Sequence, residues 1–223
     1  VALTSRGNAE LLKKQVEQFK PLAVAIESDV ALDVSIPVFR GMQGIGKVAT
    51  LPEADIIVNA LVGSAGVMPT LAAIRAGKPV VLANKETLVA AGEVVMAESK
   101  KSNVPIIPID SEHSAILQCL QGEQADSVEK ITITCSGGPF REWQKEKMDA
   151  ATADDALKHP TWSMGKKITI DSATWMNKGF EVIEAKHLFG LDLDRIKVLI
   201  HRKALVHSMV EFVDGSYLAQ MAL

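Results

Sequence analysis

The fold is decided by residues 79–113, PVVLANKETLVAAGEVVMAESKKSNVPIIPIDSEH. Two short apolar runs, 79–83 and 104–109, lie on either side of a helical pattern. Runs of this kind are typical of strands that helices bury on both faces of a parallel sheet. Polar residues follow both runs, and open α/β sheets bind their ligands at the carboxyl ends of their strands. The stretch therefore predicts a β-α-β unit with a ligand site at its edge.

The same alternation continues back to the first residue. Apolar runs also lie at residues 1–3, 22–26 and 55–61, with helical patterns between them. Asn8 can cap a helix that Pro21 ends. This β-α-β-α order predicts an α/β protein whose residues 1–109 form a doubly wound parallel sheet that binds a dinucleotide.

Residues 110–223 are organised differently and are predicted to form a second α/β domain, a connective and catalytic domain with the candidate metal and substrate residues. The polar segment 141–159 suggests a helix followed by a mobile loop. Asp214-Gly215 predicts a hairpin turn. Strands are predicted at residues 129–134, 166–170, 196–200, 205–213 and 216–222.

Composition narrows the class of partner. The 223 residues carry 24 basic and 27 acidic side chains, a formal charge of −3, without a long block of either sign. This excludes the electrostatic footprint of a protein that binds nucleic acid or anionic lipid and favours a small molecule. Cys119 and Cys135 form no metal-binding or disulfide pattern and are expected to be buried thiols in a reducing compartment.

The ends of the chain and its hydropathy carry two further expectations. No apolar run approaches the roughly 18 residues of a membrane span, and the start lacks a signal-peptide plan, so we expect a soluble protein. The chain starts at Val1 without Met and stops at Leu223 within an apolar stretch. We therefore expect a fragment cut at both ends.

Two carboxylates follow the run 104–109, in the tetrapeptide Asp110-Ser111-Glu112-His113. Carboxylate oxygens are the ligands that Mg²⁺ and Mn²⁺ prefer, so Asp110 and Glu112 can hold a divalent cation. A helix with an acidic cap and first turn explains the same residues. The tetrapeptide alone leaves both interpretations open.

Residues 171–181, DSATWMNKGFE, shift that balance. If they are helical, Asn177 and Lys178 lie four and three residues before Glu181, so that an amide, an ammonium and a carboxylate converge on one polar ligand. A surface ion pair between Lys178 and Glu181 is the other interpretation. Gly179 favours a ligand site, because glycine costs about 1 kcal/mol inside a purely structural helix.

Two glycine-bearing segments suggest a binding pocket. Residues 136–139, SGGP, follow a predicted strand, and their backbone amides with the Ser136 hydroxyl can hold a phosphate. A tight turn is the alternative. Residues 159–165, HPTWSMG, place His159 and Trp162 in a predicted loop, where Trp162 suits a lid that excludes water. Burial of Trp162 in the core is the alternative.

Two polar segments in the first half follow apolar runs. Asn84, Lys85 and Glu86 mark either a ligand site or the start of a helix. Residues 5–8, SRGN, end the first run, and Arg6 there suits the 2′-phosphate of NADPH.

Taken together, five motifs closely resemble the 1-deoxy-D-xylulose-5-phosphate reductoisomerases, and the resemblance covers essentially the whole chain. It implies conversion of 1-deoxy-D-xylulose 5-phosphate into 2-C-methyl-D-erythritol 4-phosphate with NADPH and Mg²⁺ or Mn²⁺, in the non-mevalonate route to isoprenoids. It also implies a homodimer in the bacterial cytoplasm or plastid stroma, inhibited by fosmidomycin. The motifs are LANKE at 82–86, DSEH at 110–113, SGGPF at 136–140, HPTWSMG at 159–165 and DSATWMNKGFE at 171–181.

The resemblance assigns a role to individual residues. It implies a metal site of Asp110, Glu112 and Glu181, and catalytic roles for Lys85, Glu112 and His159. Substrate contacts are implied for Lys85, Ser111, Ser136, His159, Ser172, Asn177, Lys178 and His207. NADPH contacts are implied for Arg6, Gly7, Asn8, Asn84, Glu86 and Gly165, and a closing flap for Trp162 and Met164.

The sequence departs from the family's pattern in several places. The glycine-rich turn after the family's first strand and its C-terminal helical domain are absent, so we expect this chain alone to be inactive. Cys135 stands where glycine is usual, and Ala204 stands where the family has a pocket-side serine, after two added cations at Arg202 and Lys203. These departures leave a second hypothesis, a non-catalytic ligand-binding module with the same fold.

Overall fold

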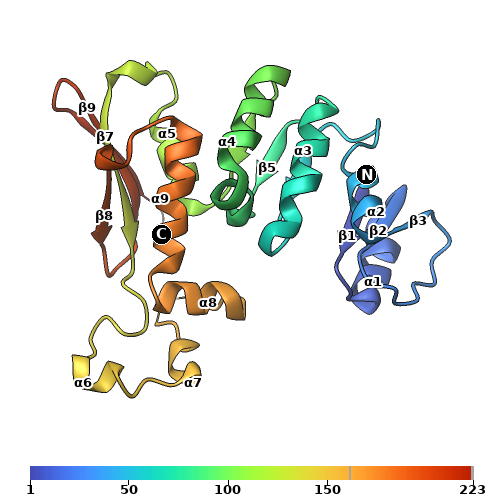
Figure 1. The fold of residues 1–223 in the computed structure, drawn as a ribbon, viewed down its shortest axis with the longest axis horizontal. Helices are drawn as coiled ribbons and strands as arrows, with labels where there is room; N and C mark the ends of the chain where they lie inside the picture. The colour runs from blue at the N-terminus through green and yellow to red at the C-terminus, as the bar shows by residue number, and fades with distance from the viewer. Residues whose placement is uncertain (161, 222–223) are drawn as a thin grey trace. The chain divides into compact units, whose positions relative to one another are not determined.

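The computed structural model describes residues 1–160 and 162–221 (Figure 1). Backbone contacts divide the chain into two units, Val1–Ile107 and Pro108–Leu223. Thr161 of the 159–165 motif and Ala222 of the predicted last strand lie outside the described residues. No helix in the described part of the chain is long and apolar enough to cross a membrane.

The first unit alternates strands and helices and forms two three-stranded sheets, of order β1-β2-β3 and β4-β5-β6. The pairs β1/β2, β2/β3 and β4/β5 are parallel, which confirms the α/β fold. The elements are β1 (Ala2–Ser5), α1 (Ala9–Phe19), β2 (Ala23–Ile26), β3 (Val38–Arg40), α2 (Gly41–Val48), β4 (Ile57–Asn59), the 3-10 helix η1 (Gly63–Gly66), α3 (Val67–Arg75), β5 (Val80–Leu82), α4 (Lys85–Ser102) and β6 (Ile106–Pro108).

The start of this unit forms as the sequence predicts. The Asn8 side chain accepts a hydrogen bond from the Leu11 backbone N–H and so caps α1. The helix ends at Lys20, whose left-handed backbone precedes Pro21. Leu12 of α1 packs on Val24 and Ile26 of β2. Strand β3 was not predicted, because Val38 and Phe39 are followed directly by Arg40 and so form no apolar run.

The second unit is built on one mixed sheet of order β10-β9-β7-β8. Strand β7 pairs parallel with β8 and antiparallel with β9, and β9 and β10 form the predicted hairpin. The elements are α5 (Ser111–Cys119), η2 (Ala125–Ser127), β7 (Val128–Cys135), α6 (Lys145–Met148), α7 (Ala153–Ala156), α8 (Lys166–Ala173), α9 (Met176–Phe189), η3 (Leu193–Arg195), β8 (Ile196–Ile200), β9 (Val206–Phe212) and β10 (Tyr217–Met221).

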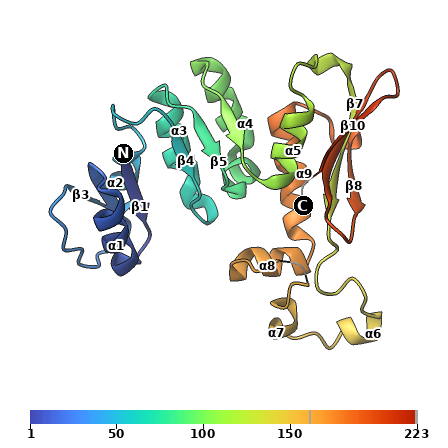
Figure 2. The same ribbon diagram turned by 180° about the vertical axis from the view of Figure 1, so that it is seen from behind.

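Helices α5 and α9 pack on this sheet, as Figure 2 shows from behind. Ile131 and Ile133 of β7 form the centre of the core together with Ile116 of α5 and Ala185 of α9. Because the core fixes both helices on one sheet, their first turns are held near the end of β7. This arrangement brings together polar residues from segments far apart in the sequence.

The predicted strand at 166–170 is wrong, because these residues form the first turns of α8. The alternation of Ile168, Thr169 and Ile170 matches a period of two. Long-range packing overrides it: Thr169 and Ala173, four residues apart, are both buried on one helical face. The Thr169 hydroxyl also donates to the Gly165 carbonyl, and this bond stabilises the first turn.

The polar segment 141–159 contains two short helices, α6 and α7. Thr152 and Asp155 form a capping box at the start of α7. The Thr152 hydroxyl and then Lys158 stabilise the charged carboxylate and lower the pKa of Asp155 to about 2. The prediction of one helix followed by a loop is therefore only partly right.

Candidate active site

Asp110 occupies the N-cap position of α5, directly after β6, and Glu112 lies in the first turn of that helix. Within the described residues, the Asp110 carboxylate makes no capping hydrogen bond to the helix. The cap interpretation therefore accounts for its position in the chain but not for the orientation of its side chain.

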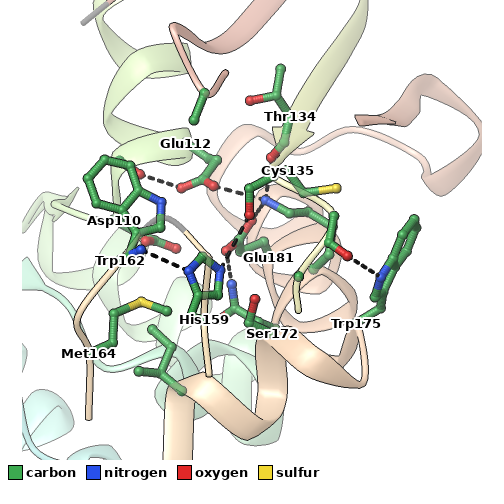
Figure 3. Close-up of a pocket in the computed structure, with 18 of the residues that line it drawn as sticks. Asp110, Glu112, Thr134, Cys135, His159, Trp162, Met164, Ser172, Trp175 and Glu181 are labelled. Carbon is green, nitrogen blue, oxygen red and sulfur yellow. Dashed lines mark hydrogen bonds and ion pairs between the residues drawn. The ribbon is translucent and has the colours of Figure 1, made fainter. Parts of the chain in front are cut away.

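Three carboxylates lie close together in the second unit (Figure 3). Asp110 and Glu112 come from the start of α5 and Glu181 from α9, and each offers an oxygen within 4.8 Å of the others. Glu181 is only 1% exposed. Carboxylate oxygens from three side chains are a donor set that fits a hard divalent cation such as Mg²⁺ or Mn²⁺. We call Asp110, Glu112 and Glu181 the acidic cluster.

His113 connects two members of the acidic cluster, although its sequence pattern does not single it out. Its fully buried ring has Nε2 at 2.9 Å from the Glu181 carbonyl oxygen and Nδ1 at 3.5 Å from the Asp110 carboxylate. Burial lowers the pKa of His113, but the nearby carboxylates of Asp110 and Glu184 outweigh it and leave the pKa raised. The imidazole therefore favours its charged form beside the carboxylates.

Lys178 lies in the first turn of α9 and is almost completely buried. Its ammonium is 2.9 Å from Glu112 Oε1, pairs with the Glu181 carboxylate and donates to the Thr134 carbonyl. Asn177 donates to the other Glu181 oxygen. Burial lowers the pKa of Lys178, but the charges of Glu181 and Glu112 outweigh it and raise the pKa. The surface ion pair considered from the sequence is thus a buried one.

The SGGP segment forms a turn that only glycine can adopt without strain. Gly137 and Gly138 have φ angles of 94° and 72°, in the left-handed region. A Cβ atom on Gly138 would lie 2.8 Å from the Ser172 carbonyl oxygen. The turn therefore brings Ser136 and Ser172 to one side of the pocket. It serves as a tight turn, and its two glycines line the same cavity as Ser136 and Ser172.

His159 lies beside this turn. Its Nε2 is 3.4 Å from the Ser136 hydroxyl, and its Nδ1 accepts a hydrogen bond of 2.9 Å from the Trp162 backbone N–H. Burial and the nearby Arg141 guanidinium lower the pKa of His159, so the ring favours its neutral form. The Trp162 side chain is 50% exposed, which excludes the core interpretation.

The acidic cluster, Lys178, Asn177, the glycine turn and His159 line one cavity of about 360 Å³ in the second unit, whereas the buried His113 lies behind its wall. The predicted site residues that line it are Asp110, Ser111, Glu112, Ser136, His159, Trp162, Met164, Ser172, Asn177, Lys178, Glu181 and His207. Gly165 is not among the lining residues and instead occupies the N-cap position of α8.

The lining residues that were not predicted include Thr134, Ser163, Ile168 and Trp175. Trp175 has a φ of 63°, which is rare for a bulky side chain, and its indole donates to the Gly137 carbonyl at 3.3 Å. It therefore supports the glycine turn from the junction between α8 and α9. The sequence carries no sign of this backbone conformation.

Two departures from the family pattern also lie in the cavity wall. Ala204 has a φ of 50°, and Cys135 is the last residue of β7. Burial raises the pKa of the Cys135 thiol, so the thiol favours its neutral form. The expectation of two buried thiols holds for Cys119, whereas Cys135 is half-buried.

The remaining predicted residues lie in the first unit, at the ends of strands. Arg6 pairs with Glu27 at 3.6 Å, and Gly7 and Asn8 form the turn before α1. A Cβ on Gly7 would lie 3.2 Å from the Ser28 hydroxyl.

Asn84 caps α4 by accepting from the Thr87 N–H, and it donates to the Leu61 and Gly63 carbonyls. Its side chain therefore links the first turn of α4 to the segment that leads from β4 into η1. Lys85 and Glu86 lie in the first turn of the same helix. The helix-start interpretation is right for this segment, and a contact with NADPH stays a prediction.

Two family profiles match the chain. The profile of 1-deoxy-D-xylulose 5-phosphate reductoisomerase matches residues 1–92, and that of its C-terminal domain matches residues 106–189. The chain is 50% identical over 227 residues to a protein of that name from Listeria monocytogenes serovar 1/2a, and 53% identical over 231 residues to one from Synechococcus sp.. These alignments cover 99% of the chain, but 60% and 59% of the relatives' lengths.

Solved structures give the same result. The chain superposes with a TM-score of 0.91 and 41% identity on a DOX-P reductoisomerase in complex with NADPH, fosmidomycin and magnesium. It superposes with a TM-score of 0.89 and 39% identity on the Zymomonas mobilis enzyme in complex with NADPH. The matches cover 99% and 100% of the chain, and 59% of each solved chain.

The glycine turn gives a first testable prediction. Gly138→Ala should lower the free energy of unfolding by more than the about 1–2 kcal/mol of left-handed strain in an alanine, because its Cβ also displaces the Ser172 backbone. Gly215→Ala is the matched control, since its φ is 83° and no described atom lies within 4 Å of its Cβ site. Urea denaturation measures both changes. Equal losses would show that the contact with Ser172 carries no weight.

The second prediction concerns His159. NMR titration of its ring should give a midpoint below the ordinary 6.5, because burial and Arg141 both disfavour the charged form. Arg141→Gln should raise the midpoint, whereas Arg141→Lys, which keeps the charge, should not. Since the unfolded chain binds this proton more tightly, His159 makes the fold less stable as pH falls below 6.5. A midpoint at or above 6.5 is the contrary result.

Proposed function

Because the chain belongs to the 1-deoxy-D-xylulose 5-phosphate reductoisomerase family, we propose that it forms the substrate site of an enzyme that rearranges and reduces 1-deoxy-D-xylulose 5-phosphate. The proposed product is 2-C-methyl-D-erythritol 4-phosphate, and the proposed reductant is NADPH. The observation that carries the proposal is one cavity that combines the acidic cluster with a glycine turn, two serines, an amide and an ammonium. Such a cavity suits a polyhydroxy ketone with a phosphate at one end.

The acidic cluster would hold the metal. Bound there, Mg²⁺ or Mn²⁺ would polarise the substrate carbonyl and acidify a neighbouring hydroxyl, which is the chemistry that a carbon-skeleton rearrangement needs. Glu112 lines the same cavity and is the candidate to hold the hydroxyl proton. The Ser111 hydroxyl donates to Glu112 at 2.5 Å and so fixes one of its carboxylate oxygens.

The phosphate would bind at the other side of the cavity. Ser136, Ser172 and Asn177 offer hydroxyl and amide donors, and Lys178 offers charge. Holding the phosphate away from the reacting carbons supplies binding energy that orients the substrate. Neutral His159 beside Ser136 can donate or accept a proton there.

Trp162 and Met164 line the cavity from the loop before α8 and are proposed as the flap (Figure 3). A flap that excludes water protects a reactive aldehyde before it is reduced. His207 of β9 would contact the substrate from the sheet side.

The first unit would bind NADPH, the source of the hydride. We assign its contacts to Arg6, Gly7, Asn8, Asn84 and Glu86, with Gly165 from the second unit, and we assign Lys85 to the substrate. The positions of the first-unit residues after β1 and β5 support their assignment, because parallel sheets bind nucleotides at the carboxyl ends of their strands. Arg6 would favour the 2′-phosphate of NADPH.

We also propose a homodimer in the bacterial cytoplasm or the plastid stroma. Val198, Leu199 and Leu218, on β8 and β10, are 40–49% exposed, and such apolar side chains are what a second copy would cover. Sedimentation equilibrium should therefore give twice the mass of the chain. A monomer at all concentrations would contradict this assignment.

The assay of function is the fall in NADPH absorbance with 1-deoxy-D-xylulose 5-phosphate and Mn²⁺. We expect substrate-dependent oxidation. The chain spans about 60% of its relatives' lengths. The same assay is therefore also applied to a hybrid of the Listeria relative, in which residues 1–223 of this chain replace the segment that aligns with them. A folded exchange protein without oxidation would contradict the proposed activity.

Within the assay, Glu181→Gln should lower kcat/KM by about 100-fold or more, because it removes a charged metal ligand without changing shape. Glu129→Gln is the control, since Glu129 pairs at the surface with Lys130. Unchanged kinetics for Glu181→Gln would remove this residue from the metal site.

Calorimetry with fosmidomycin and Mg²⁺ tests the second hypothesis, because binding without turnover would indicate a non-catalytic module.

A further inference from the structure

Lys178 places a cation inside the acidic cluster. Its ammonium contacts Glu112, Glu181 and the Thr134 carbonyl, so each of its three N–H groups faces an acceptor. The Lys178 and Glu181 side chains are 7% and 1% exposed. A buried carboxylate is costly unless a cation compensates its charge. Lys178 therefore compensates one of the two negative charges of Glu112 and Glu181, as part of the charge of a bound cation would.

A divalent cation needs the same oxygens. In the acidic cluster it would take one oxygen each from Asp110, Glu112 and Glu181. Mg²⁺ binds its oxygen ligands at about 2.0–2.1 Å, so Lys178 in its present position would lie within a few ångströms of the dication. Repulsion at that distance and the shared oxygens make the two cations competitors.

Lys178 shares its cavity with a second set of polar groups. It follows Asn177 in α9, and both line the cavity that also contains Ser136 and Ser172. A lysine carries a compact charge on a flexible four-carbon stem, so a change of rotamer moves the ammonium by several ångströms. A phosphate held by Ser136 and Ser172 would stabilise the ammonium in a second rotamer, in which it lies next to the phosphate and away from the carboxylates.

We propose that Lys178 is an exchangeable internal cation: a divalent metal displaces its ammonium from Glu112 and Glu181, and the displaced ammonium then binds the substrate's phosphate. Metal and phosphate therefore bind with positive cooperativity. Each ligand favours the same position of Lys178, so each raises the affinity of the other by an equal factor. The inference rests on the proposed function for the identity of the two ligands but concerns binding alone.

The test measures Mn²⁺ affinity by electron paramagnetic resonance of the free ion, with and without methyl phosphate, a monoester that has no hydroxyl to chelate the metal. For the protein as it stands, methyl phosphate should tighten Mn²⁺ binding by a factor of about 5 to 150, the usual range of such coupling. Mn²⁺ should tighten methyl phosphate binding by the same factor. Independent binding of the two ligands would overturn the proposal.

The variant Lys178→Gln removes the internal cation. Without methyl phosphate it should bind Mn²⁺ at least about tenfold more tightly than the parent, because competition is gone, and methyl phosphate should no longer change that affinity. Lys186→Gln is the matched control, because Lys186 is an exposed lysine on the same helix. It should keep both the parent affinity and the coupling.

Two results for Lys178→Gln would count against the proposal: coupling that persists, or weaker binding of Mn²⁺, which would mean that the lysine only arranges the carboxylates. Circular dichroism checks the fold of the variant. If the variant is unfolded, the reciprocal titrations of the parent protein still decide. An enzyme that oxidises NADPH but shows no coupling would overturn this inference and leave the proposed function standing. Coupling between Mn²⁺ and methyl phosphate without NADPH oxidation would support this inference and contradict the proposed activity.

Discussion

The buried carboxylate of Glu181 is the constraint on which the second unit depends. A charge that is only 1% exposed must be compensated within the protein. Lys178 and Asn177 bind its two oxygens, and His113 binds its backbone carbonyl. Lys178 also contacts Glu112 in the first turn of α5, and His113 lies beside Asp110 at the cap of that helix. One compensated charge thus holds the starts of α5 and α9 together.

The fold positions this charge network through ordinary elements. Helices α5 and α9 pack on the apolar face of β7 and β9, and the end of β7 supplies Thr134 and then the glycine turn. Thr134 connects the layers, since its hydroxyl donates to β9 and its carbonyl accepts from Lys178. The acidic cluster of α5 and α9 and the glycine turn after β7 therefore line one cavity. The proposed function requires this proximity, because a phosphosugar would need both sets of groups.

Local patterns predicted much of this and long-range contacts explain the rest. The Asn8 cap, the β9–β10 hairpin and the Asn177–Glu181 spacing each depend on residues close in sequence. The strand predicted at 166–170 fails because buried packing of Thr169 overrides its alternation. Lys178 could be assigned to a phosphate but not to Glu112, because 66 residues separate the partners. The left-handed Trp175 has no local signal.

The central claim is that one set of oxygens serves two cations in turn. A crystal structure with Mn²⁺ and methyl phosphate, with the ion located by anomalous scattering, tests it most directly. The account predicts Mn²⁺ among Asp110, Glu112 and Glu181, with the Lys178 ammonium moved to the phosphate near Ser136. Mn²⁺ bound instead by Asp110, His113 and Glu184, which also lie within reach of one ion, or Lys178 still paired with Glu181 beside the metal, would contradict it.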